Sequence, residues 1–134
     1  MALIKKLGIW MDHASAHLME IIDGAIITSI IASKLTQQEK SSSLSKSEHL
    51  LHQQERRSNS EYFKKISDAI SLYKEVMLFG PTTAKDELFN HIMADHKFKK
   101  IKLEVVQSDY MTENQELAFV RDYFKEGGRS IREN

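Results

Sequence analysis

The chain of 134 residues has no cysteine, one proline, five glycines and no excess of charge of either sign. Without cysteine it can form no disulfide, no thiolate zinc site and no cysteine nucleophile. Its 19 Lys and Arg residues balance 19 Asp and Glu residues. This balance argues against a strongly basic protein that coats nucleic acid, because phosphate affinity needs many unbalanced cations. The low glycine and proline content also excludes a collagen-like chain.

Long hydrophobic runs are missing as well. Acidic residues and histidines interrupt the apolar segments near the N-terminus, namely Asp12, His13, His17, Glu20 and Asp23. No segment approaches the roughly 20 apolar residues of a membrane helix, and no signal peptide is recognisable. We therefore expect a cytoplasmic protein with no membrane partner, forming a single domain over residues 1–134.

The first third of the chain has the pattern of a three-stranded antiparallel meander. Apolar residues alternate or cluster over residues 4–11, 16–22 and 25–31. The second and third of these runs are separated by Asp23 and Gly24, residues that tolerate the positive φ angles of a type I′ turn.

Residues 33–59 form a long, polar, serine-rich segment without glycine, which is typical of a functional loop or of a disordered segment. A helix is predicted to follow it, because Ser58 and Glu61 have the spacing of a capping box. Its apolar residues recur with helical period on one face: Phe63, Ile66, Ile70 and Tyr73.

The second half of the chain alternates strands and helices. The unbroken apolar run 75–79 ends at Gly80 and Pro81, which is typical of a parallel strand buried on both faces. Thr83 is a candidate cap for the next helix, whose predicted buried face is Leu88, Phe89, Ile92 and Met93.

A last strand and helix complete this half. Residues 101–105 alternate as a strand with one apolar face. Thr112 and Gln115 then form a capping box for a final helix, which ends at Gly127 and Gly128. The predicted apolar face of this helix consists of Ala118, Phe119, Tyr123 and Phe124.

The predicted order is therefore β-β-β-α-β-α-β-α. A meander followed by two right-handed crossovers gives an α/β fold with a five-stranded mixed sheet and helices on the sheet faces. This is the ribonuclease-H-like topology.

Within this topology, residues 78–88, Leu-Phe-Gly-Pro-Thr-Thr-Ala-Lys-Asp-Glu-Leu, resemble a segment of the middle domain of archaeal and eukaryotic peptide release factors. Pelota, a related ribosome-rescue factor, shares that strand–Gly-Pro-turn–Lys–helix segment. The meander, the long polar loop and a helix that opens with basic residues also follow in the same order. The resemblance implies a small bacterial relative of release factors, associated with translation and contacting the ribosome or tRNA.

One departure from this family is informative. Release factors carry Gly-Gly-Gln in the loop after the third strand, where the glutamine positions water at the ester of peptidyl-tRNA. Loop 33–59 has glutamine pairs at 37–38 and 53–54 but no glycine to supply the unusual backbone angles. We therefore expect no such hydrolysis, and keep a peptidyl-tRNA hydrolase-like activity through Gln54 as a second alternative.

Basic residues gather at two places. Arg56, Arg57, Lys64 and Lys65 surround the junction of the loop and the helix, and with Gln54 they are the predicted contacts to RNA or a partner. A second cluster at 97–102 places four lysines around Phe98. It suits either phosphate contact with RNA or a solvated face, and we favour the solvated face.

A divalent-metal-dependent nuclease is the first alternative, because ribonuclease-H-like nucleases hold Mg²⁺ with carboxylates at strand ends. Asp12 and Asp109 occupy two suitable positions, yet the strand ending at Phe79 supplies no acid. Asp12 is better explained as a turn residue. The six histidines lack a convincing third ligand, so we expect no metal and no other cofactor.

The meander has apolar residues on both of its faces. Ala16, Leu18 and Ile22 fall on one side, and Met19 and Ile21 fall on the other. A strand that is apolar on both faces and uncovered by a helix favours self-association, so the sequence predicts a homodimer.

Overall fold

The computed structural model describes residues 6–22, 25–33 and 60–125. They form one five-stranded sheet in the order β3-β2-β1-β4-β5. The strands are β1 (Lys6–Met11), β2 (Ser15–Ile22), β3 (Ala25–Ala32), β4 (Glu75–Gly80) and β5 (Lys102–Gln107). The helical segments are residues 60–70, α3 (Ala84–Met93), the 3-10 turn η1 (His96–Phe98) and α4 (Glu113–Lys125).

The strand pairing confirms the predicted mixed sheet and its ribonuclease-H-like order. β1 pairs antiparallel with β2, and β2 pairs antiparallel with β3. β4 lies between β1 and β5 and is parallel to both, as its unbroken apolar run predicts. Ile9 of β1 is therefore flanked by Leu18 on one side and Leu78 on the other.

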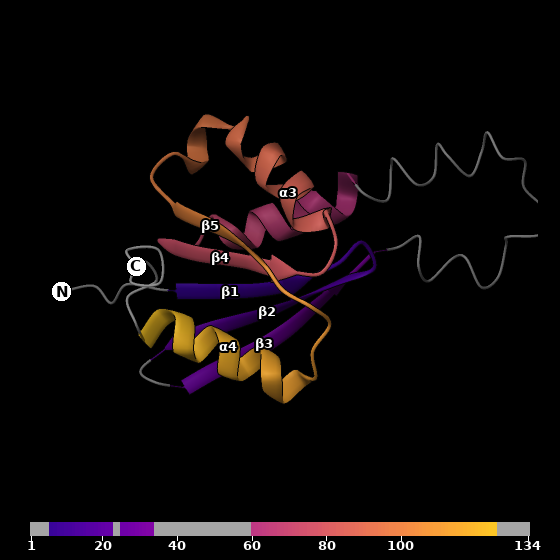
Figure 1. Cartoon of the computed structure of the whole chain (residues 1–134). Coiled ribbons are helices and arrows are strands. Elements are labelled where there is room, and N and C mark those ends of the chain that lie inside the picture. Colours follow the sequence, from indigo (N-terminus) through magenta and orange to yellow (C-terminus); the bar gives the residue numbers. More distant parts are fainter. Residues whose placement is uncertain (1–5, 23–24, 34–59, 126–134) are drawn as a thin grey trace, which may run out of the picture.

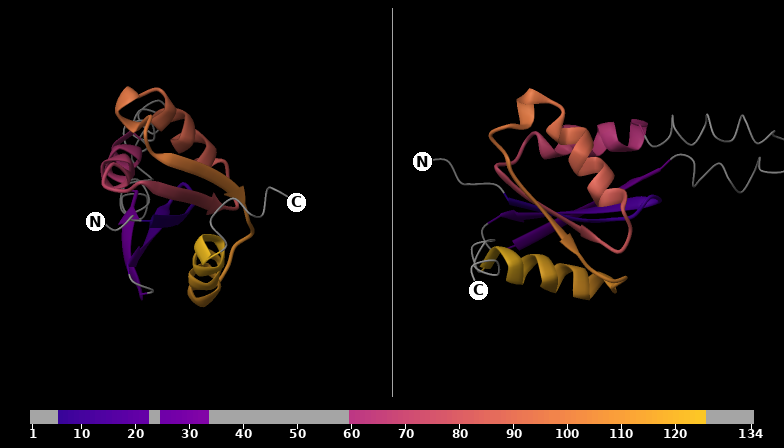
Figure 2. Two further views of the ribbon diagram at one scale, coloured as in Figure 1. Left: turned by 90° about the vertical axis from the view of Figure 1, so that its left-hand side faces the viewer. Right: turned by 45° about the horizontal axis from the view of Figure 1, so that its top comes forward.

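Helices cover both faces of the sheet (Figures 1 and 2). The helix at 60–70 and α3 bury one face, where Ile66, Ile70, Leu88 and Ile92 contact the strands. Of the described helices, only the yellow helix α4 covers the opposite face. Each face thus has its own apolar cluster, and the sheet lies between the two.

Helix α4 approaches the sheet closely at Gly8 of β1. A Cβ built at Gly8 would lie 2.6 Å from one methyl group of Val120. Val120 is fully buried, although the predicted apolar face of this helix did not include it. The capping box itself is confirmed: the Gln115 N–H donates to Thr112 Oγ1 at 3.2 Å, and the Thr112 N–H donates to Gln115 Oε1 at 2.9 Å.

The start of α3 differs from the sequence prediction. Thr83 is the N-cap residue, but its side chain makes no capping hydrogen bond. Its hydroxyl donates to the Glu87 carboxylate at 3.0 Å, while Thr82 Oγ1 accepts from the Ala84 N–H at 3.2 Å. The buried face also lies nearer the N-terminus than predicted, because Met93 is exposed and Lys85 is buried.

Several predictions lie outside the described residues. They are the turn at 23–24, the loop at 34–59 with the capping residue Ser58, and the helix stop at 127–128.

Tyr62 joins the helix at 60–70 to the turn between β1 and β2. Its buried hydroxyl donates to the carbonyl oxygen of Asp12 at 2.8 Å. Burial raises the pKa of the Tyr62 phenol, and the negative charge of Asp12 raises it further. The folded state therefore stabilises the protonated phenol, and this stabilisation is complete below about pH 10 and is lost as the pH rises further.

We expect Tyr62→Phe to lower the free energy of unfolding by about 1 kcal/mol at neutral pH, because one buried hydrogen bond is lost. Above about pH 10 the difference in free energy of unfolding between the variant and the unmodified chain should shrink. The phenol then loses its proton more readily in the unfolded chain than in the folded chain, which destabilises the folded state of the unmodified chain. Urea unfolding at several pH values measures both effects. Tyr110→Phe, at an exposed position, is the control. An equal response of the two variants would contradict the role assigned to the Tyr62 hydroxyl.

Candidate nucleic-acid interface

The predicted contact residues divide into two groups. Gln54, Arg56 and Arg57 lie outside the described residues. Lys64 and Lys65 lie on the exposed side of the helix at 60–70. Lys64 Nζ pairs with Asp68 Oδ2 at 3.2 Å, one helical turn further on, and both side chains are well exposed. Such a pair contributes only about 0.3–0.5 kcal/mol, so a phosphate oxygen can displace Asp68 readily.

Lys64 lines a groove of about 280 Å³ between the helix at 60–70 and the segment α3–η1. We call this hollow the lysine groove. One wall consists of Ser60, Lys64, Ser67 and Asp68, and the other of His91, Asp95, Lys97 and Phe98. The fold therefore brings Lys64 and Lys97, which lie more than 30 residues apart in the sequence, to one groove. For the second cluster, the sequence favoured a solvated face over phosphate contact.

The wall formed by η1 is built by local contacts. The Asp95 carboxylate accepts from the Lys97 N–H at 3.0 Å and so begins the 3-10 turn. Phe98 is buried and anchors the turn to the core. Lys97 Nζ lies 5.2 Å from the centre of the Phe98 ring, and Lys99 and Lys100 are exposed beside it. In the sequence, this wall is marked only by one aromatic residue, Phe98, among the lysines of residues 97–102.

The lysine groove is lined by two lysines, two aspartates and one histidine. Lys64 and Lys97 line opposite walls, and His91 lies on the same wall as Lys97. Asp68 and Asp95 equal the two lysines in number, but the Asp95 carboxylate is already engaged with the backbone N–H of Lys97. Phe98 is buried, so it offers no surface on which a base could stack. The arrangement favours phosphate contacts over base recognition.

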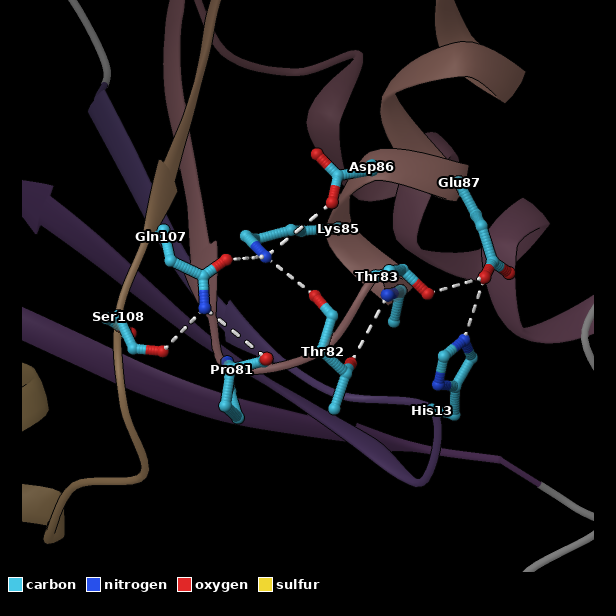
Figure 3. Close-up of polar contacts among 10 residues, drawn as sticks. His13, Pro81, Thr82, Thr83, Lys85, Asp86, Glu87, Gln107 and Ser108 are labelled. Atoms are coloured by element: carbon cyan, nitrogen blue, oxygen red, sulfur yellow. Dashed lines mark hydrogen bonds and ion pairs between the residues drawn. The ribbon is translucent and has the colours of Figure 1, made fainter.

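A second polar cluster lies at the carboxyl ends of β4 and β5 (Figure 3). Lys85, on α3, is only 2% exposed. Its Nζ donates to the Thr82 carbonyl oxygen at 2.6 Å and to Gln107 Oε1 at 2.8 Å, and lies 3.6 Å from Asp86 Oδ2. Lys85, part of the release-factor-like segment, thus joins the ends of two strands to the start of a helix. With its donors directed at protein acceptors, we assign it a structural role.

The β1–β2 turn lies beside this cluster. His13 Nε2 is 3.1 Å from Glu87 Oε2, which also accepts from the Thr83 hydroxyl. Both members of the His13–Glu87 pair are about half exposed. The pair ties the turn to α3 on the surface (Figure 3).

The two carboxylates of the nuclease alternative have different environments. Asp12 Oδ1 accepts from the N–H groups of Ala14 and Ser15 at 2.8 and 3.0 Å, as expected of a turn residue. Asp109 is exposed on the segment after β5. In the described part of the chain, no three His, Asp or Glu residues are grouped so as to hold a metal ion.

None of the helices in the described ranges has the length and the apolar character that a membrane span requires.

Comparisons with known proteins support the fold. No family model and no curated protein sequence matches the chain. Among solved structures, Pelota of Thermoplasma acidophilum matches with a TM-score of 0.60 and 14% identity over 92% of this chain. Pelota of Archaeoglobus fulgidus matches with a TM-score of 0.57 and 8% identity over 89% of it. An archaeal translation termination factor matches with a TM-score of 0.51 and 14% identity over 96% of it.

These matches confirm the expected structural likeness to Pelota and to a termination factor. The chain spans 34%, 31% and 41% of the lengths of the three proteins, in the same order. At such low identity the likeness shows a shared fold.

Proposed function

We propose that this chain is a non-catalytic binding protein associated with translation, which contacts ribosomal RNA or tRNA through the lysine groove and the basic residues that precede it. The observation that carries the proposal is the convergence of Lys64 and Lys97 on one hollow from distant parts of the sequence. The structural likeness to Pelota and to a termination factor supports the choice of RNA as the polyanion.

The absence of Gly-Gly-Gln from residues 33–59 is the reason for proposing binding without hydrolysis. Arg56 and Arg57 stand a few residues before the helix that carries Lys64, so the proposal includes them as further contacts, together with Gln54 and Lys65. No contact among the described residues favours the nuclease or the hydrolase alternative, and neither is proposed.

The test is a charge reversal on both walls of the groove, Lys64→Glu with Lys97→Glu. Loss of two phosphate contacts should weaken binding to tRNA or to isolated ribosomes by about tenfold or more at moderate salt. The slope of log K against log salt should become shallower by about 1.4 to 1.8, since each contact releases roughly 0.7–0.9 counterion. Fluorescence anisotropy with labelled tRNA and ribosome co-sedimentation measure these changes.

The matched control reverses two exposed cations on α4, Arg121→Glu with Lys125→Glu, on the opposite face of the sheet. It changes the net charge equally and should leave RNA affinity within about twofold. If both double variants weaken binding equally, the contact is a general charge effect and the groove is not the site. A third variant, Arg56→Ala with Arg57→Ala, tests the contacts that precede the helix. Unchanged co-sedimentation would remove those residues from the interface.

A further inference from the structure

The two edges of the sheet differ in how they are protected. β5 forms one edge and carries charged side chains, among them Lys102 and Glu104. β3 forms the other edge and has the sequence Ala-Ile-Ile-Thr-Ser-Ile-Ile-Ala, without charge, proline or glycine. Natural proteins usually blunt an exposed edge with charge, proline or a bulge, because its free N–H and C=O groups can pair with another strand. β3 has none of these protections.

Most side chains of β3 are exposed, as expected of a strand at the edge of a sheet. Ile27 is 56% exposed and Ile30 is 64% exposed, and they point to opposite faces because their numbers differ in parity. Thr28 and Ser29, at the centre of the strand, are also exposed. Within the described residues, β2 is the one strand that pairs with β3. The outer edge is therefore a row of backbone donors and acceptors flanked by exposed isoleucines.

We propose that β3 pairs antiparallel with β3 of a second copy of this chain, joining two five-stranded sheets into one. Such a contact is isologous, so each residue of β3 faces the same strand in its partner. A charged residue at the two-fold axis would face its own copy, and the strand carries no charge at any position. Its eight uncharged residues, five of them β-branched, suit pairing with a copy of themselves.

The register of this pairing follows from the geometry of strands. Side chains directly opposite each other in an antiparallel pair point to the same face of the sheet. Around a two-fold axis, a residue can therefore face itself or a residue an even number of positions away. The midpoint of Ala25–Ala32 falls between Thr28 and Ser29. If the two strands overlap over nearly their full length, the two-fold axis lies at Thr28 or at Ser29, and that residue faces its own copy.

The first test adds a charge to each exposed isoleucine, Ile27→Lys with Ile30→Lys. The unmodified chain should sediment at twice the mass of its 15.5 kDa monomer at high micromolar concentration, and this variant should sediment as a monomer. The control, Leu72→Lys with Met93→Lys, replaces two other exposed apolar residues and should remain a dimer. Far-ultraviolet circular dichroism checks that both variants keep the fold. A monomeric parent chain, or equal loss of dimer in both variants, would overturn the proposal.

A second test does not depend on the charged variant folding. The chain has no cysteine, so a single introduced thiol can react only with its copy or with the reagent. Opposite residues in an antiparallel pair have Cα atoms about 4.5–5.5 Å apart, within the range that a disulfide spans. Under mild oxidation, Thr28→Cys or Ser29→Cys should form a covalent dimer at least tenfold faster than Asn114→Cys, at an exposed position on α4. If neither does so, β3 does not lie on the two-fold axis.

Discussion

Replacing Gly80 with alanine is expected to lower the free energy of unfolding by about 3 kcal/mol or more, the largest effect of any single change considered. Gly80 ends β4 with a φ of 151°, a backbone conformation that side-chain-bearing residues rarely adopt. A Cβ at this position would lie 2.2 Å from the carbonyl oxygen of Met11 in β1. Backbone strain of about 1–3 kcal/mol and an overpacking penalty of similar size act together.

Urea or guanidinium unfolding followed by circular dichroism measures the loss. Pro81→Ala, at the next position, is the matched control and should change stability by less than about 1 kcal/mol, since it alters mainly the entropy of the unfolded chain. A Gly80→Ala variant as stable as the control would mean that β1 and β4 can separate at this point. The close approach of the two strands would then not be required by the fold.

Lys85→Met is the second large expected effect, a loss of about 2–4 kcal/mol in the free energy of unfolding. Methionine is similar in length and fills the same space, so packing is largely kept. The two short hydrogen bonds from Nζ to Thr82 and Gln107 disappear, and each hydrogen bond from a charged donor contributes about 1.5–3 kcal/mol. The variant also no longer has to bury a charged ammonium group, which is unfavourable. This gain offsets part of the loss in the free energy of unfolding.

Asp86→Asn is the control for Lys85, because the Asp86 carboxylate is exposed and 3.6 Å from Nζ. It should change stability by less than about 1 kcal/mol. A Lys85→Met variant more stable than the parent chain would show that desolvation of the ammonium outweighs its hydrogen bonds. If the variant is stable but binds RNA poorly, the structural role assigned to Lys85 is wrong.

Both changes concern the Gly-Pro-turn-Lys segment within residues 78–88, which resembles a segment of the release factors. The resemblance did not show what these residues do. Gly80 is needed because β1 and β4 run side by side in parallel register, with Leu7 opposite Val76 and Trp10 opposite Phe79. Lys85 is buried because β5 brings Gln107 to the start of α3. Met11, which contacts Gly80, and Gln107, which accepts from Lys85, both lie far from these residues in the sequence.

Features that depend on local patterns could be predicted from the order of residues. Alternation of apolar residues and unbroken apolar runs predicted the five strands, and the Thr112–Gln115 capping box predicted the start of α4. These patterns act over a few residues, so they can be recognised along the chain. Other features arise only when distant segments meet in the folded chain: Lys64 lies across one groove from Lys97, and Gly8 packs against Val120. The position of β3 at an edge of the sheet is a feature of the same kind. Such contacts depend on the order of strands in the sheet and on which face each helix covers, and no short stretch of sequence contains that information.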